Sequence, residues 1–135
     1  MQKIAGFNLL EILITLSIIG ILSILCFPIY SQHIIHARRL EAEVNLIKLA
    51  NALEKYYLLK NTYENATLEE LNFSKRIAGD QYDLKIVSVT SSDFLIKASP
   101  IGNQAKKDIA CASLSLNSAG IKKITGTGEL TECWQ

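Results

Sequence analysis

The chain has 135 residues, with 14 Lys and Arg against 13 Asp and Glu, which gives a formal net charge of +1. This length fits a single domain, and the near-neutral charge argues against a dedicated nucleic-acid-binding domain, which would normally be clearly basic. Hydrophobic residues make up 49% of the sequence, an ordinary share for a globular protein, but they are unevenly distributed.

An uncharged apolar segment covers residues 12–30, where 14 of the 19 residues are apolar. As a helix rising about 1.5 Å per residue it would span roughly 28 Å, close to the ~30 Å hydrocarbon core of a bilayer. A cleaved secretory signal would have a shorter apolar core and a small-residue cleavage site. This segment instead ends in Phe27-Pro28-Ile29-Tyr30. We therefore predict a retained membrane segment, which argues against a cytosolic soluble enzyme.

Glu11 is an acid at the edge of this apolar segment. A charged residue inside a transmembrane helix costs about 2.5–3.5 kcal/mol at the centre and points to a functional role. The alternative is that Glu11 lies at headgroup level and only favours the dipole of the helix N-terminus. The run Gly6-Phe7-Asn8-Leu9-Leu10-Glu11, followed by an apolar helix that ends at Pro28, resembles the N-terminus of type IV pilins.

The resemblance implies that a prepilin peptidase cleaves between Gly6 and Phe7 and methylates the new amine of Phe7. Residues 1–6 would be the cleaved leader, leaving 135 − 6 = 129 residues. Glu11 would be the acid that assembly requires, because a carboxylate and an amine attract strongly in a low-dielectric helix bundle and can set the axial register. The chain departs from the family pattern at Asn8, where many members have Thr, and at Ala5, where a basic residue is usual.

The helical pattern continues beyond the apolar segment. Apolar residues recur at helical spacing in two stripes, Leu40, Val44 and Ile47, and Leu46, Ala50, Leu53 and Tyr57. We predict one helix over residues 7–61, with residues 7–30 as its transmembrane and filament-core part and with kinks at Gly20 and Pro28. The two stripes either bury one wide face in a single core or pack against both a core and adjacent subunits.

The rest of the chain alternates apolar and polar residues as antiparallel strands do. Strands are predicted over residues 82–86, 94–98 and 112–116, with a possible fourth over 121–125, and a short helical turn over 68–77. The prediction is an α+β fold in which the second half of the long helix packs on a sheet of about four strands. Residues 31–135 then form the head, as in the pilin fold that the resemblance implies.

Three cysteines need places in this scheme. Cys26 lies in the apolar segment and is expected to be an inert buried thiol. Cys111 and Cys133 are expected to form a disulfide in an oxidising compartment, whereas in the cytosol they would be unrelated thiols. The pattern of Asp108 before Cys111, residues 114–120 and the final Cys133-Trp134 resembles PilE-type minor pilins, whose C-terminal segment is stapled in this way.

No catalytic set of side chains is legible, and no metal or cofactor is expected, because His33 and His36 lack a third ligand at a defined spacing. The resemblance implies a pilus subunit, held in the inner membrane with its head in the periplasm, and then assembled with other pilins into an extracellular filament. The filament's use in motility, adhesion or DNA uptake stays open.

Two alternatives to this interpretation remain. One is a type II secretion pseudopilin, although members of its major class use calcium rather than a disulfide in the C-terminal loop. The other is a DNA-receptor minor pilin. The lysines that would contact phosphates in that case are Lys106, Lys107, Lys122 and Lys123, and the sequence favours a solvated polar face for them.

Overall fold

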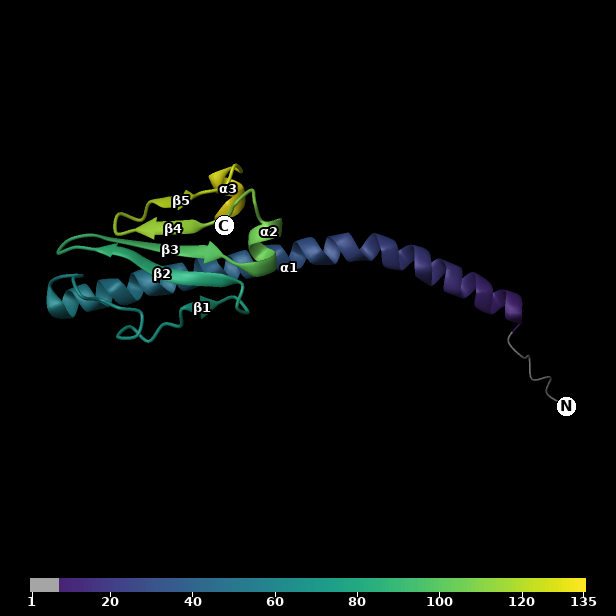
Figure 1. Ribbon diagram of the computed structural model, residues 1–135, viewed down its shortest axis with the longest axis horizontal. Coiled ribbons are helices and arrows are strands. Elements are labelled where there is room, and N and C mark those ends of the chain that lie inside the picture. The colour runs from purple at the N-terminus through teal and green to yellow at the C-terminus, as the bar shows by residue number, and fades with distance from the viewer. Residues whose placement is uncertain (1–7) are drawn as a thin grey trace. The chain divides into compact units, whose positions relative to one another are not determined.

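The computed structural model describes residues 8–135, and residues 1–7, with Gly6 and Phe7 among them, lie outside this description. The chain divides into two compact units between Ile34 and Ile35. The elements in chain order are α1 (Leu9–Lys60), β1 (Arg76–Ile77), β2 (Tyr82–Val89), β3 (Phe94–Pro100), α2 (Gly102–Lys107), β4 (Leu114–Asn117), β5 (Lys122–Ile124) and α3 (Leu130–Cys133) (Figure 1).

In the first unit, α1 is apolar around its whole circumference. Every large apolar side chain between Leu9 and Tyr30 is exposed, for example Leu9 at 77% and Ile24 at 76%. Cys26, expected to be buried, is a free and exposed thiol of the same helix, so only lipid or neighbouring helices can cover it. A helix that is apolar on all sides is stable in lipid or in a protein interior. Among the described residues, α1 is the helix that is long enough and apolar enough to cross a membrane.

In the second unit, the later part of α1 lies along one face of a five-stranded antiparallel sheet with the order β1-β2-β3-β4-β5 (Figure 1). The helix ends at Lys60, and the following Asn61 has a left-handed φ of 57°. The Asn61 amide donates to the carbonyl of Tyr57 (2.7 Å), an arrangement that closes many helices.

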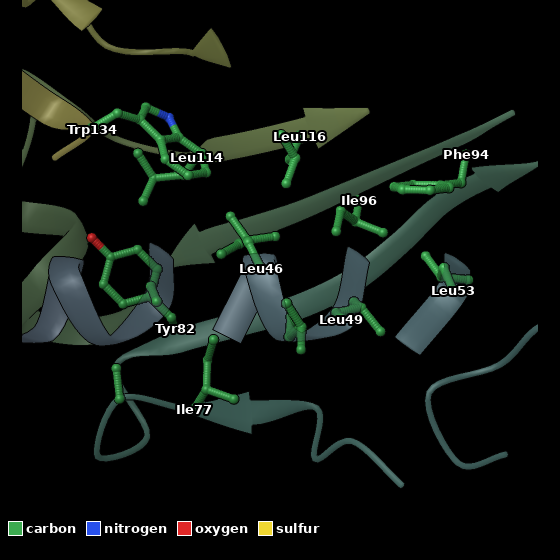
Figure 2. Packing of buried hydrophobic residues seen from close by; sticks show 14 of the residues in the cluster. Leu46, Leu49, Leu53, Ile77, Tyr82, Phe94, Ile96, Leu114, Leu116 and Trp134 are labelled. Carbon is green, nitrogen blue, oxygen red and sulfur yellow. The ribbon is translucent and has the colours of Figure 1, made fainter. Parts of the chain in front are cut away.

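The core forms where one stripe of α1 meets the inward face of the sheet. The helix contributes Ala42, Leu46, Leu49 and Leu53, all with no exposed surface. Figure 2 shows their partners, which come from all the longer strands and from the C-terminus: Tyr82, Phe94, Ile96, Leu114, Leu116 and Trp134. Of the two predicted stripes, the one containing Leu46 and Leu53 is buried, whereas Leu40, Val44 and Ile47 remain 40–42% exposed.

The α+β prediction is confirmed, with differences in its details. The sheet has five strands rather than about four, because residues 76–77 pair with β2 where the sequence predicts a helical turn. Ala78, Gly79 and Asp80 all have positive φ and form the tight connection that folds β1 back onto β2. The two short helices α2 and α3 lie outside the sequence prediction.

The third predicted strand also begins later than expected. β4 starts at Leu114 and not at residue 112, because Ala112 has a left-handed φ of 51° that a strand cannot accommodate. Cys111 therefore lies in a turn, three residues before β4.

The stability of the head should depend on the buried stripe of α1 and not on the exposed one. We expect Leu46→Ala to lower the free energy of unfolding by about 2–5 kcal/mol, because it removes buried methyl groups and leaves a cavity. Val44→Ala, on the exposed side of the same helix, should change it by no more than about 0.5 kcal/mol. Urea unfolding of the full chain in detergent, followed by the fluorescence of its one tryptophan, Trp134, measures both. Equal losses in the two variants would contradict the assignment of the faces.

Candidate functional site

The beginning of α1 places Glu11 in the first helical turn. Asn8 precedes the helix directly, and its backbone carbonyl accepts hydrogen bonds from the amides of Glu11 (3.0 Å) and Ile12 (3.3 Å). Its side-chain Oδ1 accepts from the amide of Leu10 (3.4 Å). Asparagine is among the preferred N-cap residues. The departure from the family pattern at position 8 therefore has a structural role as a helix cap.

The polar side chains of the apolar segment bond to the helix backbone. The hydroxyls of Thr15, Ser17 and Ser23 each donate to a carbonyl three or four residues earlier, at 2.8 Å. These bonds satisfy hydroxyl groups that would otherwise be unpaired in lipid. Gly20 and Pro28 both lie inside α1, and the kinks expected at them stay predictions.

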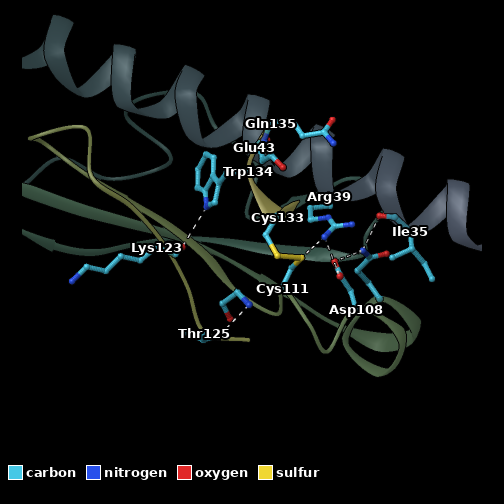
Figure 3. The surroundings of a disulfide bond; sticks show 12 residues. Ile35, Arg39, Glu43, Asp108, Cys111, Lys123, Thr125, Cys133, Trp134 and Gln135 are labelled. Carbon is cyan, nitrogen blue, oxygen red and sulfur yellow. Dashed lines mark hydrogen bonds and ion pairs between the residues drawn. A yellow bond between two sulfur atoms is a disulfide. The ribbon is translucent and has the colours of Figure 1, made fainter. Parts of the chain in front are cut away.

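Cys111 and Cys133 are joined by a disulfide, with their Cα atoms 5.4 Å apart (Figure 3). Both residues are buried. The chain packs closely here, since a Cβ on Gly126 would overlap with the Ala110 backbone and one on Gly128 would lie 2.9 Å from the Ala110 carbonyl oxygen. The glycines of residues 125–128 thus allow two backbone segments to lie side by side beside the disulfide.

A buried polar cluster lies next to this disulfide. Gln104, which has no exposed surface, has its Nε2 within hydrogen-bonding distance of the Ile35 carbonyl (3.0 Å) and of Asp108 Oδ2 (3.1 Å). The Tyr82 hydroxyl donates to the same Asp108 oxygen (3.1 Å), and burial raises the pKa of Tyr82. Arg39 of α1 forms an ion pair with Asp108 (3.5 Å) and also donates to Sγ of Cys111.

A second α1 side chain, Glu43, holds the C-terminal residue. Its Oε2 accepts from the backbone amide of Gln135 (3.0 Å), and the residue is only 3% exposed. Burial raises the pKa of Glu43, and the amide of Gln135 and the charge of Arg39 partly offset this. The sequence prediction gives neither Arg39 nor Glu43 a role in the head. The sequence feature that could have indicated these roles is the i, i+4 spacing of Arg39 and Glu43, which places both on one side of the helix beside its buried stripe.

The four lysines considered from the sequence do not form one patch. Lys106 and Lys107 lie on α2. Lys122 and Lys123 are neighbours in β5, so their side chains point to opposite faces of the sheet. Lys122 lies over the ring of Trp134, 4.9 Å from its centroid, and Lys123 is exposed on the other face.

The strand register instead aligns Lys123 with two lysines that the sequence does not single out. Lys85 of β2 pairs with Lys97 of β3, Lys97 pairs with Ser115 of β4, and Ser115 pairs with Lys123 of β5. These four residues, here called the lysine row, cross the outward face of the sheet. Between residues 8 and 135, no group of three His, Cys, Asp or Glu side chains is placed to hold a metal ion.

Comparisons with known proteins agree on one family. A family model described as type IV minor pilin ComP, DNA uptake sequence receptor, matches residues 28–115. The non-core minor pilin PilV of Neisseria meningitidis is 25% identical, with a TM-score of 0.51 over 70% of this chain and 92% of that one. A type IV pilin of Shewanella oneidensis is also 25% identical, with a TM-score of 0.52 over 75% and 98%. No curated protein matches the chain.

The buried carboxyl of Glu43 should make the stability of the head depend on pH. Because its pKa is higher in the folded state, its contribution is full below the ordinary carboxyl pKa of about 4.3 and is lost as the pH rises through the folded value. Glu43→Gln keeps an acceptor for the Gln135 amide and has no charge to bury. We expect this variant to be more stable than wild type at pH 7, with the difference shrinking toward pH 4.

Urea unfolding of the full chain at a series of pH values checks this expectation. Glu41→Gln, at an exposed position of the same helix, is the matched control and should follow the wild-type profile. A Glu43→Gln profile parallel to wild type over the whole range would show that Glu43 does not titrate differently on folding.

Proposed function

Because the chain belongs to the type IV minor pilin family of ComP, the DNA uptake sequence receptor, and is therefore a type IV pilus subunit, we propose a route by which it is processed and assembled. The observation that carries this proposal is α1, whose first part is apolar on every side and begins with a capped turn that contains Glu11. The matching family and the two similar structures are all pilins, so the pseudopilin alternative gains no support.

In this proposal, prepilin peptidase cleaves between Gly6 and Phe7 and methylates the amine of Phe7. Cleavage there leaves the new amine one residue before the cap Asn8, at the end of the helix where the dipole disfavours a positive charge. Glu11, in the first turn, supplies the compensating negative charge within the subunit or to a neighbour. Until assembly, residues 7–30 hold the subunit in the inner membrane and the head, residues 31–135, lies in the periplasm.

The exposed stripe of α1 is the surface that we propose for contact with neighbouring subunits. Leu40, Val44 and Ile47 are 40–42% exposed, and Leu58 on the same side is 82% exposed. Their spacing of four, three and eleven residues repeats the 3.5-residue period with which helices pack side by side. The assembly machinery of the inner membrane would add the subunit to the filament by bringing such helices together.

Glu11→Ala should separate membrane insertion from assembly. Removing a charge from the end of an apolar helix favours insertion, so the variant should be found in the membrane at wild-type levels. Its recovery in sheared filaments should fall at least tenfold, because the partner of the Phe7 amine is missing. Immunoblots of membrane and filament fractions measure both quantities.

Glu41→Ala, an exposed acid in the head part of α1, is the control and should enter filaments normally. Intact mass of the membrane-extracted protein tests the processing itself, which should give Phe7 as the first residue with one added methyl group. Wild-type recovery of Glu11→Ala in filaments would contradict the role of the acid.

We further propose that the head binds DNA, as the name of the family model states for ComP. The support from this chain is the lysine row. With neighbouring strands about 4.8 Å apart, the row extends roughly 14 Å, comparable to the ~12 Å width of the major groove of DNA. Lys85 and Lys97 stand directly opposite each other, an arrangement of like charges that destabilises a sheet and that a polyanion would relieve. Asp83, an acid that precedes Lys85 by two residues on the same face of β2, is paired with Arg76 (3.8 Å).

Lys97→Gln should weaken DNA binding without weakening the fold. Three phosphate contacts predict a slope of about −2.7 in a plot of log affinity against log salt concentration. Each lost contact makes the slope shallower by about 0.9. The variant should therefore bind duplex DNA about eightfold more weakly at 0.1 M salt. Its resistance to urea should not fall, since a like-charge pair is removed.

Fluorescence anisotropy of a labelled duplex at several salt concentrations measures this slope. Lys48→Gln, which removes an exposed lysine from α1, is the control with the same change of net charge and should keep the wild-type slope. Equal slopes for Lys97→Gln and wild type would place the DNA elsewhere on the head.

A further inference from the structure

The C-terminal residues 133–135 lie between α1 and the edge strand β5 and contact both. The Trp134 indole is 6% exposed, and its Nε1 donates to the backbone carbonyl of Lys123 (3.4 Å). Its ring lies under the Lys122 ammonium. On the other side, the amide of Gln135 donates to Glu43 of α1 (3.0 Å), as Figure 3 shows together with the contact to Lys123.

β5 has few other contacts that hold it. It is three residues long and is the last strand of the sheet, so it pairs only with β4, at Leu116↔Lys122, Ser115↔Lys123 and Leu114↔Ile124. Short edge strands of this kind are the least strongly specified part of a sheet. The Trp134 indole packs against β5 from the inward face, where it is part of the hydrophobic core.

The position of β5 decides whether a third lysine completes the lysine row. Because side chains alternate between the faces of a strand, β5 presents Lys122 inward and Lys123 outward while it stays paired with β4. Trp134 holds β5 at both residues, through the Lys122 ammonium and the Lys123 carbonyl. On the same face, burial raises the pKa of Glu43, and the charge of Lys122 offsets part of this rise.

We propose that Trp134 is a positioning residue for the DNA surface, which holds the short strand β5 on the sheet so that Lys123 stays in line with Lys85 and Lys97. The Cys111–Cys133 disulfide keeps Trp134 in this place, because Cys133 is its direct neighbour. This inference rests on the DNA-binding function proposed above. It makes the C-terminal tail part of the binding surface through a residue that does not contact DNA.

The test is the salt dependence of duplex binding by the full chain in detergent. Lys123→Gln should make the slope shallower by about 0.9 and weaken the affinity about eightfold at 0.1 M salt. Trp134→Leu, which removes the ring and the N–H but keeps an apolar side chain, should change both by the same amount. Trp134→Phe keeps a ring beneath Lys122 and should restore most of the slope.

The combination of changes distinguishes positioning from a general loss of structure. The double variant Trp134→Leu/Lys123→Gln should bind like Lys123→Gln alone, because the same phosphate contact is lost only once. Cys111→Ser/Cys133→Ser, which keeps Trp134 but frees the tail, should also lose this one contact. Circular dichroism of each variant verifies that the helix and sheet are intact.

A wild-type slope for Trp134→Leu, or a further loss in the double variant, would overturn the positioning role while leaving DNA binding by the head in place. A slope for Trp134→Phe as low as that of Trp134→Leu would overturn the role of the ring. If wild type itself shows no salt-dependent binding of the duplex, the proposed DNA function falls, and the role of Trp134 falls with it.

Discussion

The structure depends on one helix that has to satisfy two different surroundings. Between Leu9 and Tyr30, α1 has apolar side chains on every side and is stable only where lipid or other apolar helices surround it. From Ile35 onward it has a buried stripe, centred on Leu46 and Leu49, that must be covered by a sheet. Because the helix is continuous, the apolar unit and the unit that contains the sheet are joined without a loop.

The same helix also holds both ends of the disulfide-bonded segment. Arg39 pairs with Asp108, three residues before Cys111, and Glu43 accepts from Gln135, two residues after Cys133. These two charged residues are one helical turn apart, so a single short stretch of α1 determines where the disulfide loop begins and ends. Burying them is costly unless they are paired, and each has its partner just outside this loop.

The two surfaces proposed for function lie on separate layers of the head. The exposed stripe of α1, proposed for contact with neighbouring subunits, lies in the helix layer. The lysine row lies on the face of the sheet opposite to the buried residues that α1 covers. Binding of DNA therefore does not require that the helix leave its neighbours in a filament. A net charge of only +1 is compatible with this surface, because the charges that matter are gathered on one face.

The sequence by itself determined the features that depend on local period and composition. The apolar run of α1, the inward alternation of β2 and β3, and the resemblance to pilins all follow from residues close together in the chain. Tertiary structure decided the rest. The two-residue strand β1 has too little sequence to signal itself, and Arg39, Glu43 and Gln104 acquire partners 69 to 92 residues away. Likewise Lys85, Lys97 and Lys123 form a row only through the register of four strands, because residues distant in sequence become neighbours only when strands pair.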